Sequence, residues 1–190
     1  MRLTPPLLAD AATAAASTAR GVSLDQFAAP TPCQEWQVRP LANHLLQVAT
    51  ALSLAGRGGA VPSDIWERDL MSEDWAIRLD EQARQAIEAW SDPSAWEGTV
   101  SMGTSEMPAG MMATMLASDL VIHSWDLARA TGQDYACLDD TAEMARVFVE
   151  QMGEQARGMG IFAQPVPVSD EAPALDKAVG LSGRDPAWKP

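Results

Sequence analysis

Apolar residues recur at intervals of three and four along most of this chain, which is the spacing of one face of an α-helix. The ranges 5–20, 40–56 and 75–90 each carry such a stripe, and glycine or proline follows each of them. The pattern therefore predicts three amphipathic helices, and each needs a partner against which to bury its apolar face.

The longest and most apolar helix is expected over residues 108–130, where proline stands at the start and a glycine follows the end. A further helix is expected from 140 to about 152. Beyond this point the chain becomes rich in proline and glycine, so we interpret residues 161–190 as a wrapping tail with a short helix near 174–179.

The stretch 94–107 has no clear periodicity. Its threonine, valine and glycine content favours a loop or one short extended piece rather than a convincing strand. Four long helices without strand alternation predict an all-α fold. We expect a single domain over residues 1–190, built as an antiparallel four-helix bundle with an additional helix and a Pro/Gly-rich C-terminal tail.

Composition and charge narrow the class of protein. The chain has 190 residues, of which 47% are hydrophobic and 21% charged, which is typical of one soluble globular domain. Thirteen Lys and Arg against 26 Asp and Glu give a net charge of −13. Phosphate backbones and anionic membrane surfaces would repel such a chain, so we expect neither a nucleic-acid partner nor a membrane partner.

The sequence also bears on cellular location. It has no run of about 18 apolar residues, and residues 1–10 lack the basic start of a signal peptide. The two cysteines, Cys33 and Cys137, lie far apart and form no C-x-x-C pair. We therefore expect a cytoplasmic protein with free thiols. Our expectation for the assembly is a monomer or a homodimer, a choice that the sequence does not decide.

The chain has two histidines, and both are expected to face inward. Asp119 and His123 are four residues apart on the most apolar helix, so their side chains lie on one face. His44 lies on the helix predicted over 40–56, among leucines and a valine. Two imidazoles and a carboxylate are a common ligand set for Zn²⁺ or another divalent transition metal, with a coordination position left for water or substrate. In the alternative interpretation, the histidines are hydrogen-bonded core residues and Asp119 pairs with His123 along the helix.

Three motifs resemble a known family. Residues 31–36 (TPCQEW), 41–45 (LANHL) and 119–132 (DLVIHSWDLARATG) are similar to the actinobacterial metal-binding branch of the DinB-like superfamily, which is related to mycothiol-dependent maleylpyruvate isomerase. Two short tail segments, 165–168 and 183–186, are also similar to endings found there. The resemblance covers almost the whole chain.

The resemblance implies a four-helix bundle whose metal ligands fall on His44, Asp119 and His123. The implied metal is zinc, with nickel, iron and manganese as alternatives, and the implied cosubstrate is a low-molecular-weight thiol such as mycothiol. The chain departs from the isomerase in two respects. That protein has a longer, two-domain chain, and its acidic ligand is glutamate, one methylene longer than Asp119.

These features lead to a hypothesis about activity. A metal-bound thiolate could attack a small electrophilic substrate, which gives an S-transferase if the conjugate is stable and an isomerase if the adduct collapses. Two alternatives stay open. One is a non-catalytic metal or small-ligand binding bundle of the stress-response type, and the other is a metal-dependent hydrolase.

Other residues could support the site but receive no catalytic role. Asp126 could orient the imidazole of His123 or be an exposed helix aspartate. Cys33 could be a reactive thiol or part of a short helix start. Four tryptophans could line a pocket or serve as ordinary packing: Trp36, Trp66, Trp96 and Trp125.

Overall fold

A computed structural model describes residues 2–103 and 105–190 of the chain. The protein is mostly helical, with one small two-stranded sheet. The long helices are α1 (Pro5–Arg20), α2 (Val38–Gly56), α3 (Trp75–Ser91), α4 (Ala109–Thr131) and α5 (Asp139–Gly158), and a shorter helix, α6 (Ala174–Leu181), follows them. Three short 3-10 helices are η1 (Leu24–Gln26), η2 (Ile65–Glu67) and η3 (Pro93–Trp96).

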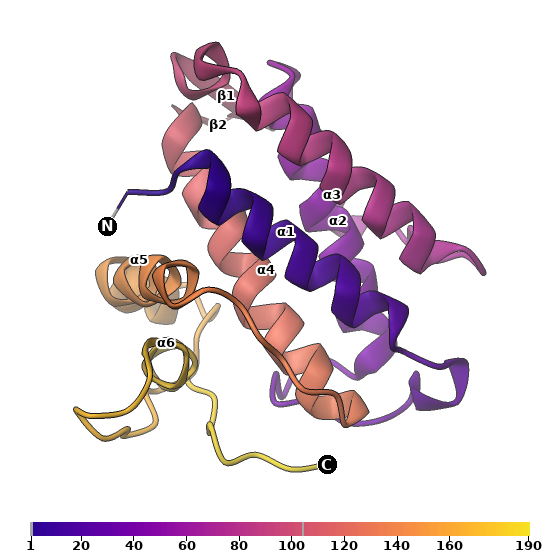
Figure 1. Cartoon of the computed structure of the whole chain (residues 1–190), viewed down its shortest axis with the longest axis vertical. Helices are drawn as coiled ribbons and strands as arrows, with labels where there is room; N and C mark the ends of the chain where they lie inside the picture. Colours follow the sequence, from indigo (N-terminus) through magenta and orange to yellow (C-terminus); the bar gives the residue numbers. More distant parts are fainter. Residues whose placement is uncertain (1, 104) are drawn as a thin grey trace.

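The first four helices pack against one another. Helix α1 contacts α3 and α4, and α2 contacts the same two helices from the other side (Figure 1). Helix α5 packs on α4 and on α6, outside this group. Helix α4 therefore has neighbours on most of its circumference, which explains why its sequence is apolar nearly all round.

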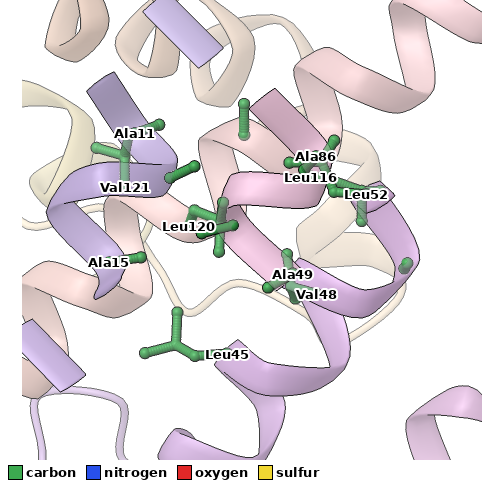
Figure 2. Packing of buried hydrophobic residues seen from close by; sticks show 14 of the residues in the cluster. Ala11, Ala15, Leu45, Val48, Ala49, Leu52, Ala86, Leu116, Leu120 and Val121 are labelled. Carbon is green, nitrogen blue, oxygen red and sulfur yellow. The ribbon is translucent and has the colours of Figure 1, made fainter. Parts of the chain in front are cut away.

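The hydrophobic core lies where the four helices meet. Leucines and valines of α2 and α4 face small alanines of α1 and α3 (Figure 2). Burying such side chains stabilises the fold by about 25 cal/mol for each Å² of apolar surface removed from water. The labelled members are Ala11, Ala15, Leu45, Val48, Ala49, Leu52, Ala86, Leu116, Leu120 and Val121.

Helix ends agree with the sequence signals in most places. Gly132 closes α4 in the left-handed conformation, with φ of 70°. Helix α2 begins at Val38, two residues before the expected start. Pro40 is compatible with this earlier start because it falls in the first turn, where the missing N–H has no intrahelical partner to lose. Helix α5 continues through Gly153 to Gly158, whereas the sequence predicted an end near Met152.

The stretch 94–107 differs from its expectation. It contains η3 and then a hairpin in which β1 (Thr99–Met102) pairs antiparallel with β2 (Ser105–Pro108). Thr104 lies outside the described residues. Of β1 only Val100 is buried, so the alternation that marks a strand is too short to stand out in the sequence.

Two sets of hydrogen bonds tie residues of the C-terminal tail to α6 and α4. The N–H of Val166 donates to the carbonyl of Gly180 at 2.9 Å. Arg129 of α4 donates through Nη2 to the carbonyls of Pro186 and Trp188, at 3.2 and 3.0 Å. Within residues 2–103 and 105–190, no helix has both the length and the apolar character that crossing a membrane requires.

Candidate metal centre

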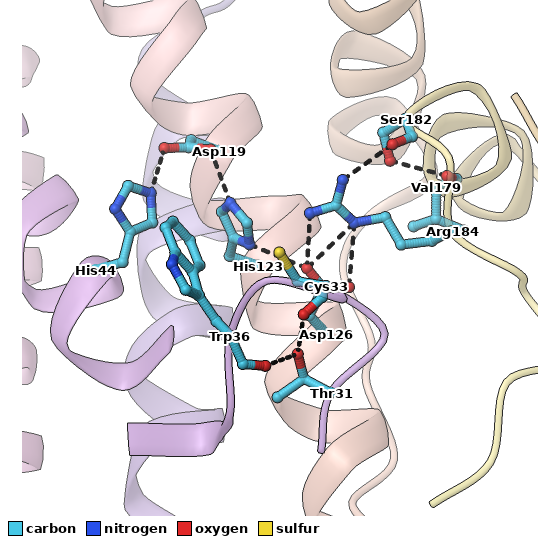
Figure 3. A network of polar contacts seen from close by, with 10 residues as sticks. All are labelled: Thr31, Cys33, Trp36, His44, Asp119, His123, Asp126, Val179, Ser182 and Arg184. Atoms are coloured by element: carbon cyan, nitrogen blue, oxygen red, sulfur yellow. Dashed lines mark hydrogen bonds and ion pairs between the residues drawn. The ribbon is translucent and has the colours of Figure 1, made fainter. Parts of the chain in front are cut away.

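The three predicted ligands meet at one place between α2 and α4 (Figure 3). His44 Nε2 lies 3.0 Å from Asp119 Oδ2, and His123 Nε2 lies 3.3 Å from Asp119 Oδ1. The two imidazole rings are nearly perpendicular, with centroids 4.9 Å apart. Each carboxylate oxygen of Asp119 therefore faces the Nε2 atom of a different histidine.

The helices explain this convergence. Asp119 and His123 are one turn apart on α4, so they share the face that packs against α2. Their side chains are 32% and 10% exposed, and that of His44 is 16% exposed. The site is thus recessed but open to solvent on the side of Asp119.

The protonation states suit a metal. Burial alone would raise the pKa of Asp119, but the charges of His44 and His123 outweigh it and lower the pKa to about 2. Burial lowers the pKa of His123, although Asp119 and Asp126 act in the opposite direction. A carboxylate and a neutral imidazole are the forms that bind divalent metals.

The spacing of the donor atoms also fits a metal. Two ligands that each lie 2.0–2.2 Å from a tetrahedral zinc ion are about 3.3–3.6 Å apart. The two histidine nitrogens lie 3.0 and 3.3 Å from the nearest Asp119 oxygens. One donor atom from each of the three side chains lies within 4.8 Å of the other two, which is compatible with a shared ion.

Asp126 supports the site from behind. It is fully buried, and its Oδ2 accepts a hydrogen bond from Nδ1 of His123 at 3.0 Å. Asp126 is therefore not an exposed helix aspartate. Its carboxylate is also held by Arg184, whose Nη2 donates to Oδ2 at 3.1 Å. Although burial opposes it, the charge of Asp126 raises the pKa of Arg184.

Two of the four tryptophans belong to the site. The ring centroid of Trp36 lies 4.6 Å from that of His44 and 5.3 Å from that of His123. The ring centroid of Trp66 lies 5.8 Å from that of His44. Trp96 instead packs on Trp90 at 5.0 Å. The fourth, Trp125, is buried beneath the guanidinium of Arg129.

An open cleft of about 380 Å³ borders the site and is lined by His44, Trp36 and Trp66 together with polar residues. Ligand pockets typically have volumes of about 300–1,000 Å³. A larger cavity, of about 590 Å³, lies against α5, α6 and residues 165–170 and includes none of the predicted ligands. The cleft beside His44 therefore offers a ligand a way to approach the site.

Cys33 lies behind the site, within 4.8 Å of the donor atoms of His123 and Asp126. These three side chains form a second possible ligand set. Asp126 is already paired with Arg184, however, and the positive charge of that guanidinium would repel a metal ion at this position. Burial raises the pKa of the Cys33 thiol to about 11, with a smaller opposing effect from Arg184. Cys33 is thus a neutral thiol and not an activated nucleophile.

Both cysteines are free in the structure. Burial also raises the pKa of Cys137 to about 11, so at pH 8 we expect both thiols to alkylate roughly 100-fold more slowly than at the ordinary pKa of 9.0. Iodoacetamide labelling followed by mass spectrometry measures this rate. In urea without reductant both thiols should react quickly. Fewer than two reactive thiols, or equal rates in the folded and unfolded protein, would contradict the expectation.

Comparison with known proteins places the chain in a family. The model for the mycothiol maleylpyruvate isomerase N-terminal domain matches residues 8–128, which include all three predicted ligands. The chain belongs to this family. Two uncharacterized proteins of Mycobacterium tuberculosis, one from strain CDC 1551 and one from strain H37Rv, are each 30% identical to it over 184 residues. The match covers 94% of this chain and 97% of the relative.

Solved structures share the fold of this family member. The crystal structure of the mycothiol-dependent maleylpyruvate isomerase aligns with a TM-score of 0.61 and 16% identity, over 89% of this chain and 76% of that one. A histidine-to-alanine mutant of that enzyme aligns with a TM-score of 0.57 and 16% identity, over 76% of this chain and 65% of that one. At this identity the likeness concerns the fold.

Arg184 is the residue of the site that sequence reasoning missed. Residues 183–186 were predicted only to resemble a chain ending found in the family, and no function was predicted for them. The available signal was that residues 161–190 contain a single arginine. If such an arginine is buried, it needs an acidic partner. Nothing in the linear pattern shows that this partner is Asp126.

Proposed function

We propose that the protein binds one divalent metal ion, zinc in the first instance, through His44, Asp119 and His123. With a low-molecular-weight thiol of the mycothiol type as cosubstrate, it then acts as a thiol-dependent isomerase or S-transferase on a small electrophile. The convergence of the three donor groups beside an open cleft carries this proposal. Membership of the mycothiol maleylpyruvate isomerase N-terminal domain family supports the choice of thiol.

We interpret the mutually packed helices α1, α2, α3 and α4 as the DinB-like four-helix bundle of this proposal. In such bundles, side chains that project inward from facing helices form the metal and cofactor sites. His44 comes from α2, and the other two ligands come from α4. The arrangement accounts for a polar cluster inside an otherwise apolar core.

A divalent metal held by these residues would supply Lewis acidity, which favours the deprotonated, nucleophilic form of a thiol. The chain's own residues prepare this chemistry. His44 and His123 direct their Nε2 atoms to the same side as Asp119, and Asp126 holds His123 in that orientation. Trp36 covers both imidazole rings and shields them from water on one side.

The proposal predicts a stabilisation by thiols. In zinc-loaded protein, a thiol at about 100 times its Kd should stabilise the folded state by about 2.7 kcal/mol, which appears as a rise in Tm. The oxygen analogue of the same ligand should give a smaller rise, because an alcohol is far harder to deprotonate. Metal analysis of the purified protein and thermal unfolding with thiol and alcohol ligands test both points.

His44→Ala is the matching variant, since it removes one ligand at the edge of the cleft. Its Tm should not respond to the thiol. If wild-type protein loaded with zinc responds equally to thiol and alcohol, or to neither, the thiol-dependent reaction is excluded and non-catalytic metal binding becomes the better account. If the protein takes up nickel, iron or manganese in preference to zinc, the metal is reassigned and the thiol test is repeated with that ion.

A further inference from the structure

The segment that follows α6 reaches back to α4 and places Arg184 beside Asp126 (Figure 3). Arg184 is 6% exposed and lies 58 residues after Asp126 in the sequence. Its Nε lies 3.3 Å from both carboxylate oxygens, and its Nη2 lies 3.1 Å from Oδ2. The remaining nitrogen, Nη1, donates to the carbonyl of Ser182 at 3.0 Å. Each nitrogen of the guanidinium thus donates to an oxygen, and Arg184 is not among the residues that line the cleft.

This ion pair continues into the candidate metal centre. Asp126 Oδ2 also lies 3.0 Å from Nδ1 of His123, while Nε2 of the same ring lies 3.3 Å from Asp119. A carboxylate paired with a guanidinium can only accept hydrogen bonds, so Nδ1 of His123 must carry the proton. In the neutral ring, which is the form that binds a metal, the lone pair is then on Nε2, the atom that faces Asp119.

We propose that Arg184 is a positioning residue for the metal centre: it holds Asp126, whose contact with Nδ1 fixes the His123 ring so that Nε2 is directed toward Asp119. The affinity test below rests on the proposed metal binding, whereas the test of the histidine ring does not. Residues 8–128 match the family model, so the proposal also makes a segment outside the matched range part of the site.

The competing explanation is that Arg184 only anchors the tail. Arg129 allows the two explanations to be separated, because it also ties down this segment through the carbonyls of Pro186 and Trp188. No hydrogen bond or ion pair between Arg129 and Asp126 occurs among the described residues. Arg129→Met should therefore loosen the tail without touching His123, and it serves as the matched control.

The first test reads the ring directly in metal-free protein. Nitrogen-15 NMR of histidine-labelled protein at pH 8 distinguishes the two tautomers, and the chain has only two histidines to assign. In wild type and Arg129→Met, His123 should show a single tautomer with the proton on Nδ1. In Arg184→Met it should show a mixture. A proton on Nε2 in wild type, or an unchanged single tautomer in Arg184→Met, would overturn the proposal.

The second test measures zinc affinity by competition with a chelator of known Kd. Residues that hold a metal ligand in place typically contribute 10–100-fold to affinity, and Arg184→Met should weaken binding by about this factor. Arg184→Lys, which keeps the charge but not the fork of donors, should recover part of the loss. Equal affinities of Arg184→Met and Arg129→Met would show that the residue only anchors the tail.

Because Arg184→Met leaves Asp126 buried without its partner, this variant can fold poorly. The double variant Asp126→Leu/Arg184→Met removes both charges and replaces them with apolar side chains, so it should fold while leaving Nδ1 of His123 without its acceptor. We expect a mixed tautomer and a 10–100-fold loss of zinc affinity in this protein. Wild-type values for both would refute the positioning role. If wild-type protein binds no zinc, the tautomer test alone still decides the proposal.

Discussion

Replacing Asp119 by asparagine should remove most of the zinc affinity that we propose for the protein. The carboxylate lies between the two histidines, within 3.3 Å of an Nε2 atom of each, and it is the negatively charged member of the set. An amide keeps the shape of the side chain but loses the charge. A residue that only supports a metal ligand usually contributes about 10–100-fold to affinity. Asp119 is proposed as a ligand itself, so we expect its replacement to lower zinc affinity by more than about 100-fold. Competition with a chelator measures it.

Asp80→Asn is the control for this variant. The Asp80 side chain is 35% exposed, close to the 32% of Asp119, and it is also paired with basic groups, Arg20 and Arg84. Its replacement should leave zinc affinity unchanged. Asp119→Glu should retain much of the affinity, because the longer side chain keeps the same donor atoms. Wild-type affinity in Asp119→Asn would mean that Asp119 is only a hydrogen-bond partner of the histidines.

Trp90→Ala should destabilise the protein by about 3–5 kcal/mol, the range for deleting a large aromatic side chain from a core. Trp90 is fully buried in α3, and its Nε1 donates to the carbonyl of Leu52 in α2 at 2.9 Å. The ring also packs edge-on against Trp96. The variant therefore loses apolar contacts, an aromatic pair and a bond between two helices at once.

Urea denaturation of metal-free protein gives the free energy of unfolding for this comparison. Trp90→Phe is the companion variant, since it keeps much of the apolar area but has no N–H to donate. Its loss should be clearly smaller than that of Trp90→Ala. A change below about 1 kcal/mol in Trp90→Ala would show that the cavity collapses or that the site is less tightly packed than the structure indicates.

The sequence is a good guide to the long helices because apolar spacing and end signals agree there. The stretch over 75–90 was expected from its stripe, and Gly132 was expected to stop α4. Gly153 is the reason why the predicted end of α5, near Met152, is too early. A glycine inside a helix costs about 1 kcal/mol relative to alanine, and packing around α5 outweighs that local preference. Gly153 itself is buried there.

The candidate site could be predicted only where its residues share a helix or a motif. Asp119 and His123 are linked by helical spacing. His44 joined them because its helix was expected to turn it inward, and the resemblance to a family supported the set. Arg184 and the orientation of Trp36 depend on how distant segments pack, and no local preference encodes this. The hairpin over 99–108 was missed for a related reason, since most of its side chains are exposed or half-buried and leave no pattern.

The long separations within the polar network set an order of assembly on the ribosome. Bacterial and eukaryotic ribosomes add about 5–20 residues each second, so the 58 residues from Asp126 to Arg184 take about 3–12 s to synthesise. During this interval the nascent chain already contains both histidines and Asp119 but not the guanidinium that completes the network. In the growing chain, Asp126 and His123 are therefore present for several seconds before the arginine with which Asp126 pairs.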